Sequence, residues 1–205
     1  MNSISKIVDE AVAAFSTLPG IGKKSALRMV LHLAQQDKKK LEDLYVAVKN
    51  MSEKLIRCKQ CFAYSDSELC TICSDPVRNQ QTICVIESIR DLFAIEELQQ
   101  FRGVYHVLGG LISPIDGMGP ENLTIHSLFK RIENQPITEL IFAIRPTIEG
   151  DTTSYYITRH LNNPTLKISM LARGVSFGSE LEYADELTLG RSLANRLPVD
   201  KLVNL

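Results

Sequence analysis

Apolar side chains recur at every third or fourth position in the first sixty residues, which is the spacing of amphipathic helices. A first stripe, from Ile4 to Phe15, predicts one helix, which ends where Pro and two Gly follow at 18–22. Further stripes at 27–34 and 41–55 predict two more helices. The sequence therefore predicts a helical N-terminal region.

From residue 82 onward, short β-branched runs alternate with helical stretches. The runs that predict strands lie at 82–87, 103–108, 139–144 and 166–171. The stretches that predict helices lie at about 89–99, 121–133 and 152–162, and a last one lies at 183–196. Strands separated by helices favour parallel pairing, with the crossover helices packed on the faces of the sheet.

Two C-x2-C pairs stand between these regions, separated by eight residues: Cys58, Cys61, Cys70 and Cys73. Each pair lets two sulfurs reach one ion, and four thiolates complete a tetrahedral zinc site with no position left for water. The alternatives are four unrelated thiols or a redox pair, but a redox C-x2-C usually occurs singly beside a βαβ unit. We therefore expect one structural zinc ion per chain. Because so short a segment buries little surface, zinc is expected to supply its folding free energy.

Composition narrows the class of protein. The hydrophobic fraction of 44% and the charged fraction of 23% are those of an ordinary globular protein. No apolar run reaches the roughly 18 residues that cross a bilayer, and the acidic residues of the N-terminus are unlike a signal or transit peptide. The expected location is a reducing cytoplasm, with no membrane partner, where clustered cysteines indicate metal rather than disulfides. Cys84, inside an apolar run, is interpreted as a small core residue.

Positive charge is concentrated at one end of the chain. Residues 1–62 hold 11 Lys or Arg and 6 Asp or Glu, a balance of +5, whereas the remainder holds 12 and 18. Within the basic part, the segment LPGIGKKSA joins two predicted helices. Glycines at such a turn let the backbone approach a phosphate, whose charge is met by the free N–H groups of the next helix. This pattern indicates sequence-independent binding of DNA through its backbone.

Two alternatives apply to the same segment. It partly mimics the nucleotide-binding pattern G-x4-G-K-[ST], but Thr17 stands at the first Gly and Lys24 stands at the Ser or Thr that binds magnesium. It is also compatible with a plain connection between two helices.

Three acidic residues follow predicted strands. Glu87 ends the first strand, and Glu149 and Asp151 come shortly after the third. The carboxyl ends of parallel strands are where functional groups of open α/β sheets gather. The three carboxylates either converge on a hard cation such as Mg²⁺, which would support phosphodiester chemistry, or are solvated loop acids.

Taken in order, these segments resemble the RecR family of recombination mediators over nearly the whole chain. The stretches that match are LPGIGKKSA, the four cysteines, TICVIES, YHVLGGLISPIDGMGPENL, RPTIEGDTTSYYI and ARGVSFGSELEYADELTLGRSL. The resemblance implies an α+β fold in several parts: a helix-hairpin-helix region at 1–57, a four-cysteine zinc finger at 58–78, an α/β Toprim domain with a mainly parallel sheet at 79–174, and a helical tail with oligomer contacts at 175–205.

The resemblance also implies roles for individual residues. DNA contacts are expected at Lys24 and Arg28, at Lys23, where the family often has proline, and at the glycines Gly20 and Gly22. Zinc is expected on the four cysteines.

Glu87, Glu149 and Asp151 correspond to the Toprim acids, a site for Mg²⁺ or a partner. Toprim enzymes have a D-x-D pair where this chain has Glu149-Gly150-Asp151, which argues against strong metal binding. Arg145 stands where the family commonly has asparagine, and it either neutralises the acids or faces DNA or a partner.

The leading hypothesis is therefore a bacterial, non-enzymatic DNA-binding mediator that forms a dimeric or tetrameric ring. With the RecO and RecF proteins it would help load the recombinase onto gapped or single-stranded DNA. The alternative is a Mg²⁺-dependent Toprim nuclease, or a topoisomerase-like enzyme, for which 205 residues leave little room. A third possibility is a zinc-stabilised scaffold that does not touch DNA, and the basic first sixty residues argue against it.

Overall fold

The computed structural model describes residues 5–161, 163–176, 178–196 and 198. They form two compact units, one ending at Leu55 and one beginning at Ile56, and each is described separately below. Ile4, at the start of the first predicted helix, lies outside the described residues, as does part of the predicted C-terminal tail.

The first unit consists of three helices, as the apolar stripes predict. They are α1 (Lys6–Phe15), α2 (Lys23–Ala34) and α3 (Lys38–Lys54). Helix α1 packs against α2, which buries Ala26 and Val30. Between them, Gly20 adopts a φ of +79°, a left-handed conformation that side chains rarely tolerate, and Gly22 is the N-cap of α2. The turn that the sequence predicts is thus confirmed.

Helix α3 keeps its apolar stripe at the surface. No residue of α3 is buried within the described chain. Its exposed apolar side chains include Leu41, Leu44, Val48 and Met51, which follow one another at spacings of three and four. This stripe has the pattern of a helix that packs against something, yet no described residue of the first unit buries it.

The second unit begins with a small cysteine-bearing segment. Strands β1 (Ile56–Arg57) and β2 (Tyr64–Ser65) form an antiparallel hairpin, and α4 (Thr71–Ser74) is a single helical turn. The sequence does not indicate this hairpin, because two-residue strands are too short to show an alternation of apolar and polar residues.

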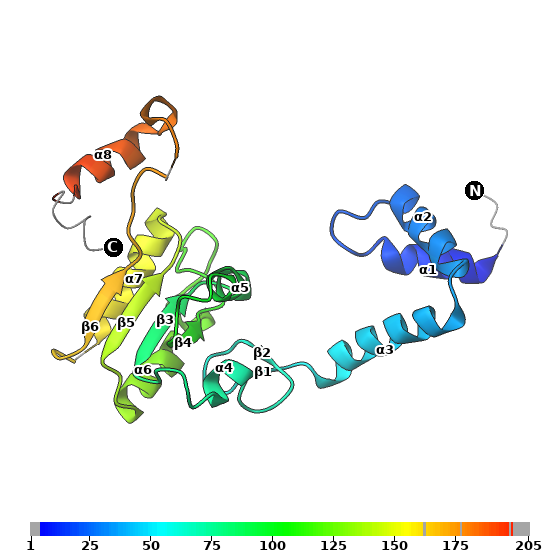
Figure 1. Cartoon of the computed structure of the whole chain (residues 1–205), viewed down its shortest axis with the longest axis horizontal. Coiled ribbons are helices and arrows are strands. Elements are labelled where there is room, and N and C mark those ends of the chain that lie inside the picture. Colours follow the sequence, from blue (N-terminus) through cyan, green and yellow to red (C-terminus); the bar gives the residue numbers. More distant parts are fainter. Residues whose placement is uncertain (1–4, 162, 177, 197, 199–205) are drawn as a thin grey trace. The chain divides into compact units, whose positions relative to one another are not determined.

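A four-stranded parallel sheet forms the rest of this unit (Figure 1). Its strands, in spatial order, are β4 (Val104–Val107), β3 (Thr82–Ile86), β5 (Glu139–Ala143) and β6 (Lys167–Met170). The crossover helices are α5 (Ile89–Glu97), α6 (Ile125–Asn134) and α7 (Ile148–His160). The predicted mainly parallel sheet is therefore confirmed. The chain reverses direction across the sheet between β3 and β5, so their carboxyl ends border a topological switch point.

The two faces of the sheet bury two different sets of side chains. Ile83 and Val85 of β3 pack with residues of α6 and α7. The alternate residues, Cys84 and Ile86, pack with α5 and with the four clustered cysteines. This alternation follows from the two-residue period of a strand. It also confirms Cys84 as a core residue, and burial raises the pKa of its thiol to about 12.

The cysteine-bearing segment also covers the free edge of the sheet. The backbone N–H of Val107, on edge strand β4, donates to the carbonyl of Cys61 at 2.8 Å. The carbonyl of Tyr105, on the same strand, accepts a hydrogen bond from the Arg131 guanidinium of α6 at 2.8 Å. An exposed edge strand can form hydrogen bonds with a strand of another chain. The finger and α6 cover the edge of β4 and occupy these two backbone groups.

Three predicted helices have different bounds in the structure. Helix α7 begins at Ile148 rather than 152, because the Thr147 hydroxyl accepts from the Gly150 N–H and caps the helix four residues earlier. The stretch predicted as a helix at 121–133 divides into a 3-10 turn, η1 (Pro120–Asn122), and α6. The last stretch likewise divides into η2 (Leu181–Tyr183) and α8 (Glu186–Ala194), whose N-cap is Asp185.

Candidate DNA-binding, zinc and carboxylate sites

The four cysteines converge as their spacing predicts. Their sulfur atoms all lie within 4.8 Å of one another, and all four residues are buried. The Cys70 N–H donates to the Cys58 sulfur at 3.3 Å, the kind of bond that favours a thiolate. A hydrogen bond from the Cys61 thiol, 3.5 Å away, lowers the pKa of Cys70. Four sulfurs at this separation fit a tetrahedral zinc ion.

Local turns bring the sulfurs together. In the first pair, the Phe62 N–H donates to the Cys58 carbonyl at 3.0 Å, and Phe62 takes a left-handed φ of 64°. In the second pair, the Ser74 N–H donates to the Cys70 carbonyl at 3.0 Å as α4 begins. Because each turn closes within a few residues, the two sulfurs of each pair are brought together locally.

The glycine turn presents a row of basic side chains at the start of α2. Lys24 and Arg28 are four residues apart, so they lie on one face of the helix, and both are exposed. Lys23 is exposed as well, at the first position of the helix. None of the three makes an ion pair with another described residue. The positive end of α2 and these side chains together can bind phosphate.

Glu87 lies at the switch point but is bound to an arginine. It follows β3 directly, and its carboxylate accepts a hydrogen bond from the Arg145 guanidinium at 2.8 Å. Arg145 follows β5, the strand that pairs with β3, and this adjacency brings the two side chains together. Of the roles considered for Arg145, the structure shows the neutralising one.

Asp151 is bound to two other arginines. Its two carboxylate oxygens lie 2.5 Å from Nη2 of Arg173 and 3.6 Å from Nη2 of Arg191. The hydrogen bond from Arg173 lowers the pKa of Asp151. Because Arg191 belongs to α8, this carboxylate ties the C-terminal helix to the sheet domain.

Glu149 and Asp151 lie on the first turn of α7 rather than in a loop, with Gly150 between them. A Cβ atom at Gly150 would come within 2.2 Å of the Arg145 carbonyl, so glycine is required for this close approach. The Glu149 backbone N–H and the Thr147 hydroxyl, both at the start of the helix, lower the pKa of the Glu149 carboxyl. Glu149 and Asp151 are therefore ionised at neutral pH, and their carboxylates have different partners.

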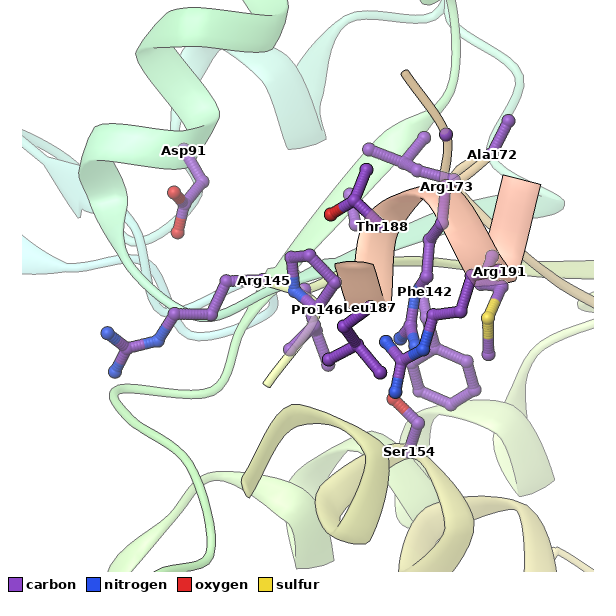
Figure 2. Close-up of a pocket in the computed structure, with 15 residues that line it drawn as sticks. Asp91, Phe142, Arg145, Pro146, Ser154, Ala172, Arg173, Leu187, Thr188 and Arg191 are labelled. Atoms are coloured by element: carbon purple, nitrogen blue, oxygen red, sulfur yellow. The ribbon is translucent and has the colours of Figure 1, made fainter. Parts of the chain in front are cut away.

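The three arginines that pair with these acids, Arg145, Arg173 and Arg191, border a pocket of about 390 Å³ between the sheet domain and α8 (Figure 2). Arg173 and Arg191 lie near each other in this view, whereas Arg145 extends away from them. Within the described residues, the four cysteines are the only group of three or more ligating side chains that is close enough to hold one metal ion. The convergence of Glu87, Glu149 and Asp151 on one cation, considered from the sequence, is not what the geometry shows.

Three arginines that make buried or ionic contacts were not predicted from the sequence: Arg131, Arg173 and Arg191. Arg131 had a visible signal, because it occupies an apolar stripe of α6 with Ile125, Leu128 and Ile132 and is itself buried. Arg173 and Arg191 had none, since their partner Asp151 is distant in the sequence.

No helix in the described part of the chain combines the length and apolar character needed to span a bilayer.

Comparison with known protein families assigns each part of the chain. Residues 8–51 match the helix-hairpin-helix family of RecR, and residues 55–75 match the RecR zinc finger domain with four cysteines. Residues 81–172 match the Toprim domain, and residues 174–197 match the C-terminal family of RecR. The zinc site is therefore supported both by its geometry and by family membership.

Relatives that match over nearly the whole chain belong to the same family. The chain is 50% identical over 201 residues to the recombination protein RecR of Flavobacterium johnsoniae, covering 98% of each chain. It is 50% identical over 192 residues to RecR of Bacteroides thetaiotaomicron, covering 94% of each. With RecR of Porphyromonas gingivalis it shares 47% identity over 192 residues, covering 94% of this chain and 93% of the relative. On this evidence the chain belongs to the RecR family of recombination proteins.

Proposed function

We propose that the protein holds DNA through the α1–α2 hairpin, without regard to base sequence, as a clamp and adaptor at gapped or single-stranded sites. As a member of the RecR family it is a non-enzymatic recombination mediator in DNA repair. The family implies that it interacts with DNA and works with RecO and RecF, which help load the recombinase.

The observation that supports the hairpin most strongly is the free basic face at the start of α2. Lys24 and Arg28 project from the same side of the helix and have no acidic partner among the described residues. An arginine or lysine already paired with a carboxylate must lose that partner before it binds phosphate. These two are available at once, next to the N–H groups that follow Gly22.

We also propose that the clamp is a homo-oligomer, a dimer or a tetramer. The support is the exposed apolar stripe of α3, together with Leu187 and Leu193 on α8, which are both about two-thirds exposed. Exposed apolar surface of this kind marks sites of association. Several weak DNA contacts on one ring would then act together.

The Toprim carboxylates fit an ionic role better than nuclease chemistry. A metal-dependent nuclease needs acidic ligands that share one cation. Here Glu87 is bound to Arg145, and Asp151 is bound to Arg173 and Arg191. The charge that a metal would neutralise is already balanced by the chain's own arginines.

The proposal is tested by reversing the charge of the hairpin. Labelled gapped DNA is titrated with wild-type protein and with Lys24→Glu/Arg28→Glu at several salt concentrations, and retention is measured on a native gel. Loss of two phosphate contacts should weaken binding by about tenfold or more at low salt, for every DNA sequence. It should also make the dependence of log K on log salt shallower by about one to two units.

The matched control is Lys38→Glu/Lys39→Glu. It makes the same change in net charge on exposed lysines at the start of α3, away from the glycine turn. We expect this variant to lose much less affinity than the hairpin variant. Equal losses would mean that only overall charge matters, and unchanged binding of the hairpin variant would exclude the hairpin as the contact.

A further inference from the structure

Arg131 is the one arginine in the core of the sheet domain, as far as the chain is described. It lies on α6 and is only 6% exposed. Its Nη1 donates to the carbonyl of Tyr105 at 2.8 Å and, more weakly, to that of Gln60 at 3.5 Å. Its Nε donates to the side-chain oxygen of Gln135 at 3.2 Å. Gln60 lies between two of the zinc ligands, so the guanidinium joins α6 to the finger.

Two features of Arg131 are left unexplained by these bonds. No hydrogen-bond partner is found for Nη2, a buried donor, among the described residues. Nor does any described carboxylate form an ion pair with this guanidinium. Burying a cation without a nearby anion costs desolvation free energy. Arg131 remains charged, because arginine does not lose its proton in proteins.

The negative groups near Arg131 are the cysteines. Burial lowers the pKa of Arg131, and the charges of Cys73, Cys61, Cys58 and Cys70 each act to raise it. A zinc ion held by four thiolates has a net charge of −2, and this centre is buried as well. The uncompensated cation and the uncompensated anionic centre therefore lie in the same part of the core.

The neighbouring histidine does not supply a second cation. His106 is fully buried, and its Nε2 lies 3.1 Å from the Thr124 carbonyl. Burial, with a smaller contribution from the charge of Arg131, lowers the pKa of His106 to about 3. At neutral pH His106 therefore adds no positive charge, and Arg131 is the buried cation beside the finger among the described residues.

From this juxtaposition we infer that Arg131 is a positioning residue of the zinc centre. It offsets the negative charge of the zinc-bound thiolates from outside the ligand set, and it holds the first C-x2-C turn against α6 through Gln60. Outer-shell partners of this kind orient ligands and tune the metal that they hold. The inference concerns the zinc site alone and does not depend on the proposed DNA contacts.

The test compares Arg131→Met and Arg131→Lys in the full-length, zinc-loaded protein. Zinc affinity is measured at pH 7 by competition with a chromophoric chelator. Removal of an outer-shell partner typically weakens metal binding by about 10- to 100-fold, and we expect a loss in that range for Arg131→Met. Arg131→Lys keeps the charge but not the planar fork of donors, so its loss should be smaller.

The matched control is Lys130→Met. Lys130 is the preceding residue of α6, exposed to solvent, and its replacement removes the same charge from the protein. Its zinc affinity should stay within about twofold of the wild type, because solvent screens an exposed charge. Equal affinities for Arg131→Met and Lys130→Met would overturn the inference.

A second readout separates charge from packing. Cobalt(II) is exchanged for zinc, and the sulfur-to-cobalt charge-transfer band is recorded for each variant. Without the compensating charge the thiolates are easier to oxidise, so the band should move to lower energy in Arg131→Met and largely return in Arg131→Lys. If zinc binding weakens in Arg131→Met while the band stays in place, Arg131 only packs the finger and the inference is wrong.

Discussion

The cysteine cluster and the three Toprim acids are both sets of potential metal ligands, yet only one set converges. The sulfurs of the four cysteines lie within 4.8 Å of one another, in a segment of 16 residues from Cys58 to Cys73. The acids come from the end of β3 and the start of α7. Two of them form ion pairs with arginines, Glu87 with Arg145 and Asp151 with Arg173. Sequence spacing is enough to place ligands that share two short turns. It is not enough for ligands whose positions depend on the whole sheet and on the cations nearby.

Zinc removal should destabilise the protein more than any change to the Toprim acids. Structural zinc contributes about 10–16 kcal/mol in small zinc-finger peptides. We expect strong chelation, or Cys61→Ser, to open residues 56–78 to protease while cleavage within residues 5–55 is unchanged. The cut sites are read by mass spectrometry. Cys84→Ala, which removes a thiol outside the cluster, should leave the zinc content at one ion per chain. Unchanged cleavage after chelation would mean that zinc does not stabilise the finger.

Asp151→Ala should have a smaller and more local effect. It removes the carboxylate that binds Arg173 and Arg191, so α8 should loosen from the sheet domain. Because the Asp151 side chain is 40% exposed, we expect a cost of only about 1 kcal/mol. Hydrogen exchange should rise in residues 178–196 and stay constant in β3 and β5. Protection that is equal in the variant and the wild type would show that this ion pair does not hold the helix.

The same contact makes a prediction about pH. Arg173 lowers the pKa of Asp151 in the folded protein, below the unfolded value of about 3.9. The contribution of the carboxylate is therefore fully present above pH 4 and is lost as the pH falls through the folded pKa. The protection factors of α8 amides, which are corrected for intrinsic exchange at each pH, should be unaffected by this group from pH 7 to pH 5 and should fall on further acidification. Asp151→Asn should lack that fall, and a fall of the same size in the variant would assign it to another group.

Arg145→Asn should change the stability of the protein less than the other variants do. It frees Glu87 from its arginine and replaces that cation with an uncharged amide. The Arg145 side chain is 62% exposed, so the stability should change by less than about 1 kcal/mol. Because Asp151 keeps its own arginines, we expect Mn²⁺, used as a spectroscopic probe for Mg²⁺, to bind no more tightly than in the wild type. Tight, stoichiometric binding would reveal a latent metal site.

Local patterns predicted most of the secondary structure. The three N-terminal helices, the four parallel strands and the glycine turn follow from periods of 3.6 and 2 and from residues that break helices. The bounds were wrong where one cap decides them, as at Thr147, which starts α7 four residues early. The β1–β2 hairpin was missed because its strands have two residues each.

Some residues of the candidate sites could be predicted from the sequence and others could not, for the same reason. The convergence of the cysteines and the exposed basic residues after Gly22 could be predicted, because each lies within one short segment. The arginine partners of the acids could not, because they depend on strand order: Arg145 meets Glu87 only because β3 and β5 are neighbours. Arg131 was within reach, since a charged residue in the apolar stripe of an amphipathic helix needs a buried partner.

Binding of DNA without cleavage is tested with labelled gapped DNA. Purified protein and DNA are mixed with Mg²⁺ at low salt and divided between a native gel and a denaturing gel. We expect DNA that is retarded on the native gel and full-length on the denaturing gel. Shortened DNA, with the shortening abolished by Glu87→Ala, would instead make this protein a metal-dependent nuclease.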